Sequence, residues 1–274
     1  MNDALREVAV TADRLIAQTL ADPRLHPSVA AALGQPHRYI APRRSRVVLS
    51  HRYGMPVMFN VDNPKDRIHI RHRKGLFYEE DVLKTIAGHF PKGGTFCDIG
   101  ANVGNHSLYM LLLAGAARVV PVEPNPDAIA LFCANMLLNQ LGDMVDFTTL
   151  GYGLGAANSD DMAIHAPKGN LGWARLRQAE AGENTISVRT GDTLLGDRHV
   201  DFIKMDVEGM EIGALQGLQA TIARDHPVLF VEVDHANADA FHALMDDYGY
   251  AVQTAFDPSG VNRNFLLLPK DKIG

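Results

Sequence analysis

From Thr95 onward, short apolar stretches alternate with stretches of helical periodicity, and this alternation constrains the fold of the chain more than any other feature. Apolar strands that alternate with helices predict a parallel sheet covered on both faces, and hence an α/β fold. The 274 residues, 46% of them apolar, suffice for one large domain of this kind or two small ones. The expected strands cover residues 95–99, 118–122, 145–150, 200–205, 228–233, 251–254 and 265–268, and helices are expected from Phe77, Gly104, Pro126, Gly209 and Asn237.

Residues 1–74 precede this alternation and predict an extension of a different kind. An amphipathic helix is expected over 3–20, followed by a loop rich in proline and arginine. Two strands, 57–61 and 67–71, flank the turn sequence Asp-Asn-Pro and predict a hairpin. In its second strand two isoleucines alternate with basic residues, so one face is expected to be apolar and the other basic.

Residues 75–274 are expected to form the main domain, which one irregular stretch interrupts. Between about 152 and 190, glycines and asparagines typical of turns replace the alternation of strands and helices. This composition predicts hairpins or a flap inserted into the plan of the sheet.

The charge of the chain is unevenly distributed. The net charge is −6, yet the stretch from Arg38 to Lys74 holds ten basic and two acidic residues and carries +8, which leaves −14 for the remainder. A basic block of this size can meet phosphates or an acidic substrate, or it can be a solvated face balanced by the acidic body. The sequence leaves both interpretations open.

Composition also indicates the compartment. Cys97 and Cys133 lie in apolar surroundings and are too few for a disulfide framework, so we expect free thiols in a reducing environment. The apolar runs fall short of the roughly 18 residues that a membrane helix needs. The first ten residues carry acids and lack the apolar core of a secretory signal. We therefore expect a cytoplasmic protein without a membrane span.

A glycine-containing loop, DIGANVGNHS at residues 98–107, follows one expected strand and opens a helix. Glycine lets the backbone pass close to a ligand, and a helix N-terminus presents free N–H groups. A dinucleotide site would have the pattern G-x-G-x-x-G, but Asn102 and Asn105 stand where its second and third glycines would be. Asp98 would repel a pyrophosphate, and it would attract a cation or hydrogen-bond to an amine. These features disfavour a nicotinamide dehydrogenase.

A second acid, Glu123, ends the next expected strand, 25 positions after Asp98. An acid at about this distance from the loop binds the ribose diol in doubly wound sheets. Asn125 already fits the cap of the following helix, so Glu123 is not needed for that role. Two carboxylates, a nucleoside and no phosphate cradle favour S-adenosylmethionine (SAM), whose amino group and sulfonium are cationic. The residues expected to bind this cofactor are Asp98, Gly100, Asn102, Gly104, Asn105 and Glu123.

These motifs make the chain similar to the FkbM-type family of class I SAM-dependent methyltransferases. The resemblance rests on DIGANVGNHS, on VEPNP at 122–126 and most specifically on IKMDVEGME at 203–211, and it covers about 75–235. Phe77-Tyr78-Glu79 and Val231-Glu232 also match the family pattern. The resemblance implies a Rossmann-like, doubly wound sheet of seven strands whose last strand is antiparallel. It also implies methyl transfer to hydroxyl oxygens, often on sugars or glycosides.

Charged residues gather where two expected central strands end. Lys204, Asp206 and Glu208 alternate with apolar residues at one strand end, and Glu232 and Asp234 lie at the other. Charges in buried strands are costly unless they are paired or used. One interpretation is an ion pair of Lys204 with Glu232 or Asp206 that stabilises the sheet. The other is a magnesium site, for which oxygen ligands are suitable. Its ligands would be Asp206, Glu232 and Asp234.

The same cluster supplies the candidates for the chemistry of the acceptor. His235 could take a proton near neutral pH, and Glu208 and Lys204 are alternatives, the latter only if burial lowers its pKa. The residues predicted to be catalytic are Asp206, Glu208, His235 and Lys204.

The sequence thus predicts a SAM-dependent O-methyltransferase that acts on a hydroxyl of a sugar-containing or related polar metabolite. The acceptor would be a small molecule or glycan, and the basic stretch favours an anionic one. Two alternatives stay open, namely an RNA ribose methyltransferase and a non-catalytic SAM-binding or assembly protein. A nucleic-acid partner is not favoured by the net charge of −6, and a homo-oligomer is left open.

Overall fold

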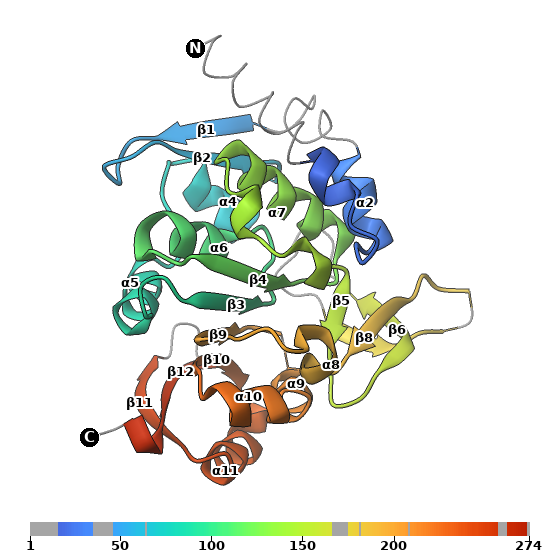
Figure 1. Ribbon diagram of the computed structural model, residues 1–274, viewed down its shortest axis with the longest axis vertical. Coiled ribbons are helices and arrows are strands. Elements are labelled where there is room, and N and C mark those ends of the chain that lie inside the picture. Colours follow the sequence, from blue (N-terminus) through green and yellow to red (C-terminus); the bar gives the residue numbers. More distant parts are fainter. Residues whose placement is uncertain are drawn as a thin grey trace.

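The computed structural model describes residues 16–34, 46–63, 65–165, 175–180, 182–207, 209–256 and 262–272. Its centre is a six-stranded sheet in the order β11-β12-β10-β9-β3-β4 (Figure 1). The strands are β3 (Thr95–Ile99), β4 (Arg118–Val122), β9 (Phe202–Met205), β10 (Val228–Asp234), β11 (Tyr250–Phe256) and β12 (Asn262–Pro269). The strands β4, β3, β9 and β10 are parallel, whereas β12 is antiparallel to both of its neighbours. The predicted α/β fold and the antiparallel last strand are confirmed.

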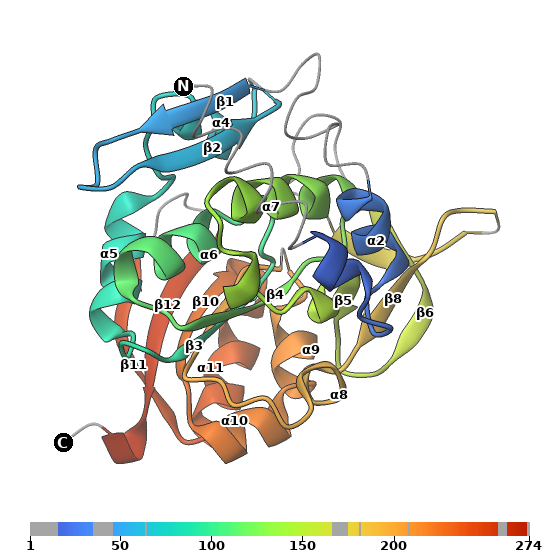
Figure 2. The ribbon, with the colours of Figure 1, turned by 45° about the horizontal axis from the view of Figure 1, so that its top comes forward.

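Successive side chains of the central strands enter two different hydrophobic cores. Phe96 of β3 and Phe202 of β9 belong to the core shared with α5, α6 and α7, whereas the next residues, Cys97 and Ile203, belong to the core shared with α8 to α11. The two groups of helices therefore cover opposite faces of the sheet (Figures 1 and 2). Burial on both faces explains why these strands are apolar throughout. The helices are α5 (Glu80–His89), α6 (Asn105–Tyr109, continued by a π-helical turn over Met110–Ala114), α7 (Pro126–Leu138), α8 (Gly191–Leu195), α9 (Glu211–Gln216), α10 (Gln219–Asp225) and α11 (Ala238–Asp247).

The prediction of a strand over 145–150 is wrong, so the sheet has six strands and not seven. Only Val145 makes a parallel bridge, to Val119 of β4, and a 3-10 helix over Phe147–Thr149 follows. The carboxylate of Asp146 starts this turn because it accepts hydrogen bonds from the N–H and hydroxyl of Thr148 at 3.1 and 2.6 Å. Pro121, on the same edge of β4, has no N–H to donate to a further strand.

The predicted hairpin is wrong in one of its strands. β2 (Val57–Val61) lies where it was expected, but its partner is β1 (Arg46–Ser50), and the second expected strand is the helix α4 (Arg67–His72). Asp66 caps this helix by accepting from the N–H groups of Ile68 and His69 at 2.9 and 3.1 Å. The alternation of isoleucines with basic residues is therefore not a strand pattern.

Of the helix predicted over 3–20, only residues 16–20 are described, and these are helical. A short helix, α2 (Pro27–Leu33), follows and packs against α7.

Asn135 of α7 and Asn139, which follows the last residue of this helix, hold the β1–β2 pair on the main domain. The side-chain amide of Asn139 accepts from the N–H of Met58 at 2.9 Å and donates to its carbonyl at 2.7 Å. One turn earlier, Asn135 accepts from the N–H of Asn60 at 2.8 Å and donates to the carbonyl of Val103 at 2.7 Å. The amides thus pair with β2 much as a neighbouring strand would. Asn135 also links β2 to the loop before α6 through its hydrogen bond to Val103.

The irregular stretch forms a separate four-stranded sheet in the order β5-β8-β6-β7 beside the main one (Figure 1). Its strands are β5 (Tyr152–Leu154), β6 (Ser159–His165), β7 (Arg175–Gln178) and β8 (Ile186–Arg189). No helix in the described parts of the chain has the length and apolarity that a membrane crossing requires.

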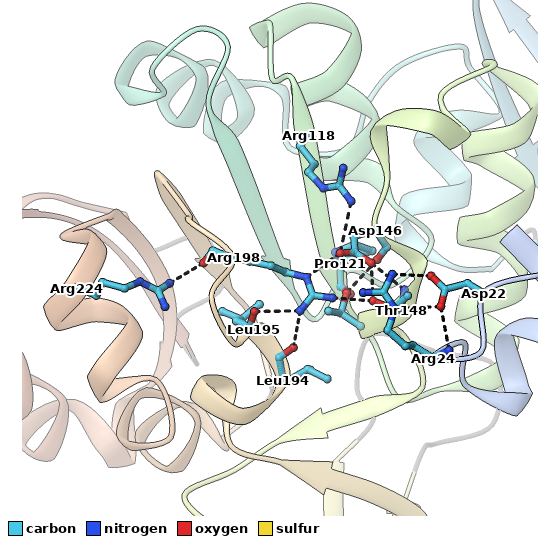
Figure 3. A network of polar contacts seen from close by, with 11 residues as sticks. Asp22, Arg24, Arg118, Pro121, Asp146, Thr148, Leu194, Leu195, Arg198 and Arg224 are labelled. Atoms are coloured by element: carbon cyan, nitrogen blue, oxygen red, sulfur yellow. Dashed lines mark hydrogen bonds and ion pairs between the residues drawn. The ribbon is translucent and has the colours of Figure 1, made fainter. Parts of the chain in front are cut away.

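At the amino ends of the parallel strands, Asp146 is the centre of a polar network (Figure 3). Its carboxylate accepts from Nε of Arg198 at 2.7 Å and forms an ion pair with Arg118, the first residue of β4, at 3.5 Å. The pair Asp22 and Arg24 of the N-terminal extension lies against this network and interacts electrostatically with it. The network therefore joins the extension to the amino ends of the strands, and the glycine-containing loop lies at their carboxyl ends.

Candidate functional site

The loop between β3 and α6 is fixed in close contact with two other elements. Gly100 has φ +72°, and a Cβ at this position would lie 1.8 Å from the carbonyl oxygen of Asp206. Gly104 has φ +83°, and its Cβ would lie 2.8 Å from side-chain atoms of Phe132 and Met136 on α7. Because a side chain at either position would also be strained by the positive φ, only glycine lets the loop approach β9 and α7 so closely.

Asp98 and Lys204 are neighbours across β3 and β9 and form the buried centre of the site. Oδ2 of Asp98 accepts from the N–H and hydroxyl of Ser107 at 3.1 and 2.6 Å, and Oδ1 lies 3.3 Å from Nζ of Lys204. The ammonium also donates to the carbonyl of Gly100 at 2.8 Å. Burial alone would lower the pKa of Lys204, but the charges of Asp98 and Asp206 outweigh it and the pKa is raised. The raised pKa favours the protonated form of Lys204 and so disfavours it as a base.

Glu123 follows β4 and is buried beside the same loop. Its carboxylate accepts from the N–H groups of Asn102 and Asn125 at 2.8 and 2.9 Å. Burial raises its pKa to about 7, although both hydrogen bonds act in the opposite direction. Asn125 caps α7 through a hydrogen bond from the N–H of Asp127, as the sequence predicted, so Glu123 does not have that role.

These groups fit the expected cofactor. Within the described part of the chain no group donates to Oδ1 of Asn102, which is buried, and Asn102 itself has φ +49°. A buried acceptor without a donor is costly unless a ligand satisfies it. Together with the carboxylates of Asp98 and Glu123, it offers acceptors to the amino group and ribose hydroxyls of SAM.

The side chain of Asn105, predicted to bind the cofactor, contacts groups of the protein. Its amide accepts from the N–H of Tyr78 at 3.0 Å, donates to the carbonyl of Tyr78 at 3.1 Å and lies 3.0 Å from Nε2 of His72. The side chain is buried and occupied by these protein groups. Asn105 therefore fixes the segment before α5 and the helix α4 beside the start of α6.

That segment brings two residues to the site that the sequence did not single out as functional. The hydroxyl of Tyr78 hydrogen-bonds to the side chains of Glu79 and Arg67, and Glu79 interacts electrostatically with Asp206 and Lys204. Burial raises the pKa of Tyr78 to about 12 and also raises the pKa of Glu79. The sequence signal for these residues was Phe77-Tyr78-Glu79, which carried only the family resemblance.

The other predicted catalytic residues do not all gather here. Asp206 follows β9 and interacts with Lys204, and burial raises its pKa against the effect of that charge. His235 is exposed on a 3-10 helix over His235–Asn237, and Glu208 lies outside the described residues. His106 is next to the site, where burial and the charge of Lys204 lower its pKa to about 3.

The magnesium site predicted on Asp206, Glu232 and Asp234 is not supported. Glu232 accepts from the amide of Asn262 at 2.7 Å, and Asp234 accepts from the N–H of Ala236 at 3.0 Å. No group of three potential ligands in the described ranges is arranged to hold a metal ion. The physical reason is Lys204, whose ammonium already supplies positive charge to Asp98 and Asp206.

Comparison with known proteins agrees with the sequence motifs. The family model described as the methyltransferase FkbM domain matches residues 98–252, more than half of the chain. No curated protein matches the sequence.

Among solved structures, a methyltransferase FkbM from Methylobacillus flagellatus KT is 18% identical with a TM-score of 0.47, and the match covers 97% of this chain and 60% of that one. The chain thus spans less than two thirds of that protein. A putative RNA methyltransferase from Pyrococcus horikoshii is 12% identical with a TM-score of 0.40, over 69% of this chain and 81% of that one. Identities and scores this low carry no information about the substrate of this chain.

Proposed function

The chain belongs to the FkbM family of SAM-dependent methyltransferases, and from this membership we propose that it methylates a hydroxyl oxygen of a sugar-containing or related polar metabolite. When bound, SAM supplies the methyl group. The residues of this chain that would hold it are those around the loop, with Asp98 and Asn102 toward its amino acid part and Glu123 toward its ribose.

The observation that carries the proposal is the buried charge at the carboxyl ends of β3, β4 and β9. Asp98, Glu123 and Asp206 come from these three strands, and the single ammonium of Lys204 interacts electrostatically with all of them. Methyl transfer is a direct displacement, so the main contribution of the protein is to align the acceptor oxygen with the methyl carbon. A site with more acids than bases suits a cationic methyl donor and the removal of a hydroxyl proton.

The acceptor we propose is anionic, because basic residues approach the site from α4. Arg67 hydrogen-bonds to Tyr78, which adjoins Glu79, and Arg71 is one turn further along the same helix. An arginine at the acceptor side attracts carboxylate or phosphate groups.

The experiment that tests the function is a mass-spectrometric screen of the purified protein with SAM. The acceptors are neutral methyl glycosides, hexose phosphates and uronic acids. We expect a gain of one methyl group on a hydroxyl of an anionic member. Methylation of nitrogen or carbon, or of ribose in an RNA oligonucleotide alone, would contradict the proposal, and so would SAM binding without transfer to any acceptor.

A further inference from the structure

The segment before α5 contains the least expected backbone conformation near the site. Among the described residues other than glycine, four have positive φ, and two of them, Glu79 and Asn102, adjoin the site. Glu79 has φ +55° and ψ +47° at the start of α5, and its side chain makes no hydrogen bond that caps the helix. A glutamate in the left-handed region is uncommon, and such conformations cluster at functional sites where the surroundings enforce them.

The surroundings of Glu79 do enforce this conformation. Asn105, which is buried, binds both the N–H and the carbonyl of the preceding residue, Tyr78. On the other side, α5 begins at Glu80, whose carboxylate accepts a hydrogen bond from the hydroxyl of Tyr53. Because the chain is fixed before and after Glu79, its left-handed turn directs the side chain to a defined place next to the loop that binds the cofactor.

The groups that face Glu79 come from three elements. Tyr78 hydrogen-bonds to its carboxylate, Arg67 of α4 and Lys204 of β9 act on it as positive charges, and Asp206 acts as a negative one. Lys204 acts on the carboxylate of Asp206, whereas the carboxylate of Glu79 is linked to Arg67 of α4 through the hydroxyl of Tyr78. The alternatives are weaker, since Lys204 is held as a cation, His106 is a poor base and His235 is exposed.

We propose that Glu79 is the catalytic base that accepts the proton of the acceptor hydroxyl, with Tyr78 and Asn105 as its positioning residues. This inference rests on the proposed function, methyl transfer to oxygen. In the step, the hydroxyl oxygen forms a bond to the methyl carbon while the bond between that carbon and sulfur breaks. The electron pair of the broken bond stays on sulfur, and the hydroxyl proton passes to the carboxylate of Glu79 and from there to solvent. Burial beside Asp206 makes Glu79 a stronger base than an exposed glutamate.

The kinetic test compares Glu79→Gln with Asp81→Asn, which removes the same charge at an exposed position in the first turn of α5. With the acceptor identified by the screen, we expect kcat of Glu79→Gln to fall about 100-fold or more, the range of a lost general base. The affinity for SAM and the melting temperature should change little, and the acid limb of the pH profile of kcat/KM should disappear. Glu79→Asp should restore part of kcat. A Glu79→Gln enzyme with unchanged kcat and pH profile would overturn the base and leave the proposed function standing.

A second measurement needs no acceptor. Protein labelled with [5-¹³C]glutamate is titrated by NMR with bound S-adenosylhomocysteine, and the Glu79 carboxyl signal is the one missing from Glu79→Gln or Glu79→Asp. We expect this signal to titrate above the range of exposed glutamates and to move to lower pH in Asp206→Asn, because a neighbouring negative charge is removed. A signal that titrates in the ordinary range and does not respond to Asp206→Asn would overturn the proposal even if no acceptor of the screen were methylated.

Discussion

At the scale of single residues, the ammonium of Lys204 determines how so many acids can lie together. Asp98, Asp206 and Glu232 all interact with it, and it is nearly inaccessible to solvent. Two close carboxylates repel each other unless a cation or proton lies between them. Lys204 provides that cation from the protein itself, so the site has no need of an added metal ion for this purpose.

Two outcomes are expected for Lys204. Methyl transfer should survive EDTA, which is checked by measuring turnover with and without added magnesium. Lys204→Met should lower the free energy of unfolding in urea by about 3–5 kcal/mol, because it leaves Asp98 buried without its partner. The double variant Lys204→Met/Asp98→Asn should regain part of that stability. Loss of activity in EDTA that magnesium restores would show instead that a metal ion is required.

Glu123 is expected to determine the affinity for SAM. Glu123→Ala removes up to two charge-assisted hydrogen bonds to the ribose, each contributing about 1.5–3 kcal/mol, so the Kd from calorimetry should rise at least about tenfold. Asp127→Ala, a change of an exposed acid in the first turn of α7, is the control. Because the pKa of Glu123 in the cofactor-free protein is about 7, the affinity should also fall as the pH is lowered through this value. Undiminished affinity in Glu123→Ala, or equal affinity of the parent for NAD, would contradict the assignment.

At the scale of elements, α4 contributes buried histidines on one side and basic residues on the other. His72 is stacked on Phe59 with the ring centres 4.4 Å apart, and burial lowers its pKa to about 3. An unfolded histidine has a pKa of about 6.5, so between these values the unfolded state binds the proton that the folded state excludes. The contribution of neutral His72 to the free energy of unfolding is therefore present above about pH 6.5 and is lost as the pH falls below this value.

This acid sensitivity can be measured. Between pH 7 and pH 5, His72 alone should reduce the free energy of unfolding by about 2 kcal/mol. Urea denaturation of His72→Gln should show a correspondingly weaker dependence on pH than the parent. An identical dependence in both proteins would mean that His72 binds its proton as readily in the folded state as in the unfolded state.

The arginines of α4 are expected to act on the acceptor and not on the cofactor. Neutralising Arg67 and Arg71 to glutamine should raise the KM of an anionic acceptor several-fold and leave the Kd of SAM unchanged. The matched control removes two charges from the end of the same helix, Arg73→Gln with Lys74→Gln, where both residues are exposed. A KM that is insensitive to the first pair and to salt would mean that the basic residues are only a solvated surface.

The element scale also shows what could be read from the sequence. The order of strands and helices after Thr95 was predictable because both faces of the sheet are buried and the strands are apolar. The helix α4 was not predictable, because its isoleucines alternate with basic residues as they would in a strand. The helical spacing is that of the buried His69 and His72, and Asp66 caps the helix. The third strand was not predictable either, because a side chain, Asp146, turns the chain away from β4. The placement of Glu79 depends on the contacts of its neighbour Tyr78 with Asn105, 27 positions further along the chain, and local patterns do not contain such contacts.

At the scale of the whole molecule, two polar networks lie at opposite ends of the parallel strands. The network around Asp146 lies at the amino ends, and the loop and its acids lie at the carboxyl ends. Although burial acts to raise the pKa of Asp146, hydrogen bonds from Thr148 and Arg198 lower it. The network also holds the segment of Asp22 and Arg24, so it links the N-terminal extension to the main sheet (Figure 3).

Substitution of Asp146 should therefore affect stability alone. Asp146→Ala should lower the free energy of unfolding by about 2–3 kcal/mol, because hydrogen bonds to a charged group are lost and Arg198 loses its carboxylate partner. The Kd of SAM should be unchanged. Asp143→Ala, at an exposed acid three residues earlier, should change stability by less than about 0.5 kcal/mol. Weaker SAM binding in folded Asp146→Ala would show that the two ends of the sheet are coupled.

The way in which α7 holds β2 has a consequence for how new specificities could be made. The amides of Asn135 and Asn139 recognise only main-chain groups of β2, at Met58 and Asn60, so the attachment does not depend on which side chains β2 carries. Outward-facing positions of the β1–β2 ribbon can then be randomised in a library while the ribbon keeps its place. Asn135 and Asn139 thus make the β1–β2 ribbon a segment whose side chains can be exchanged, and the rest of the protein need not be redesigned with it.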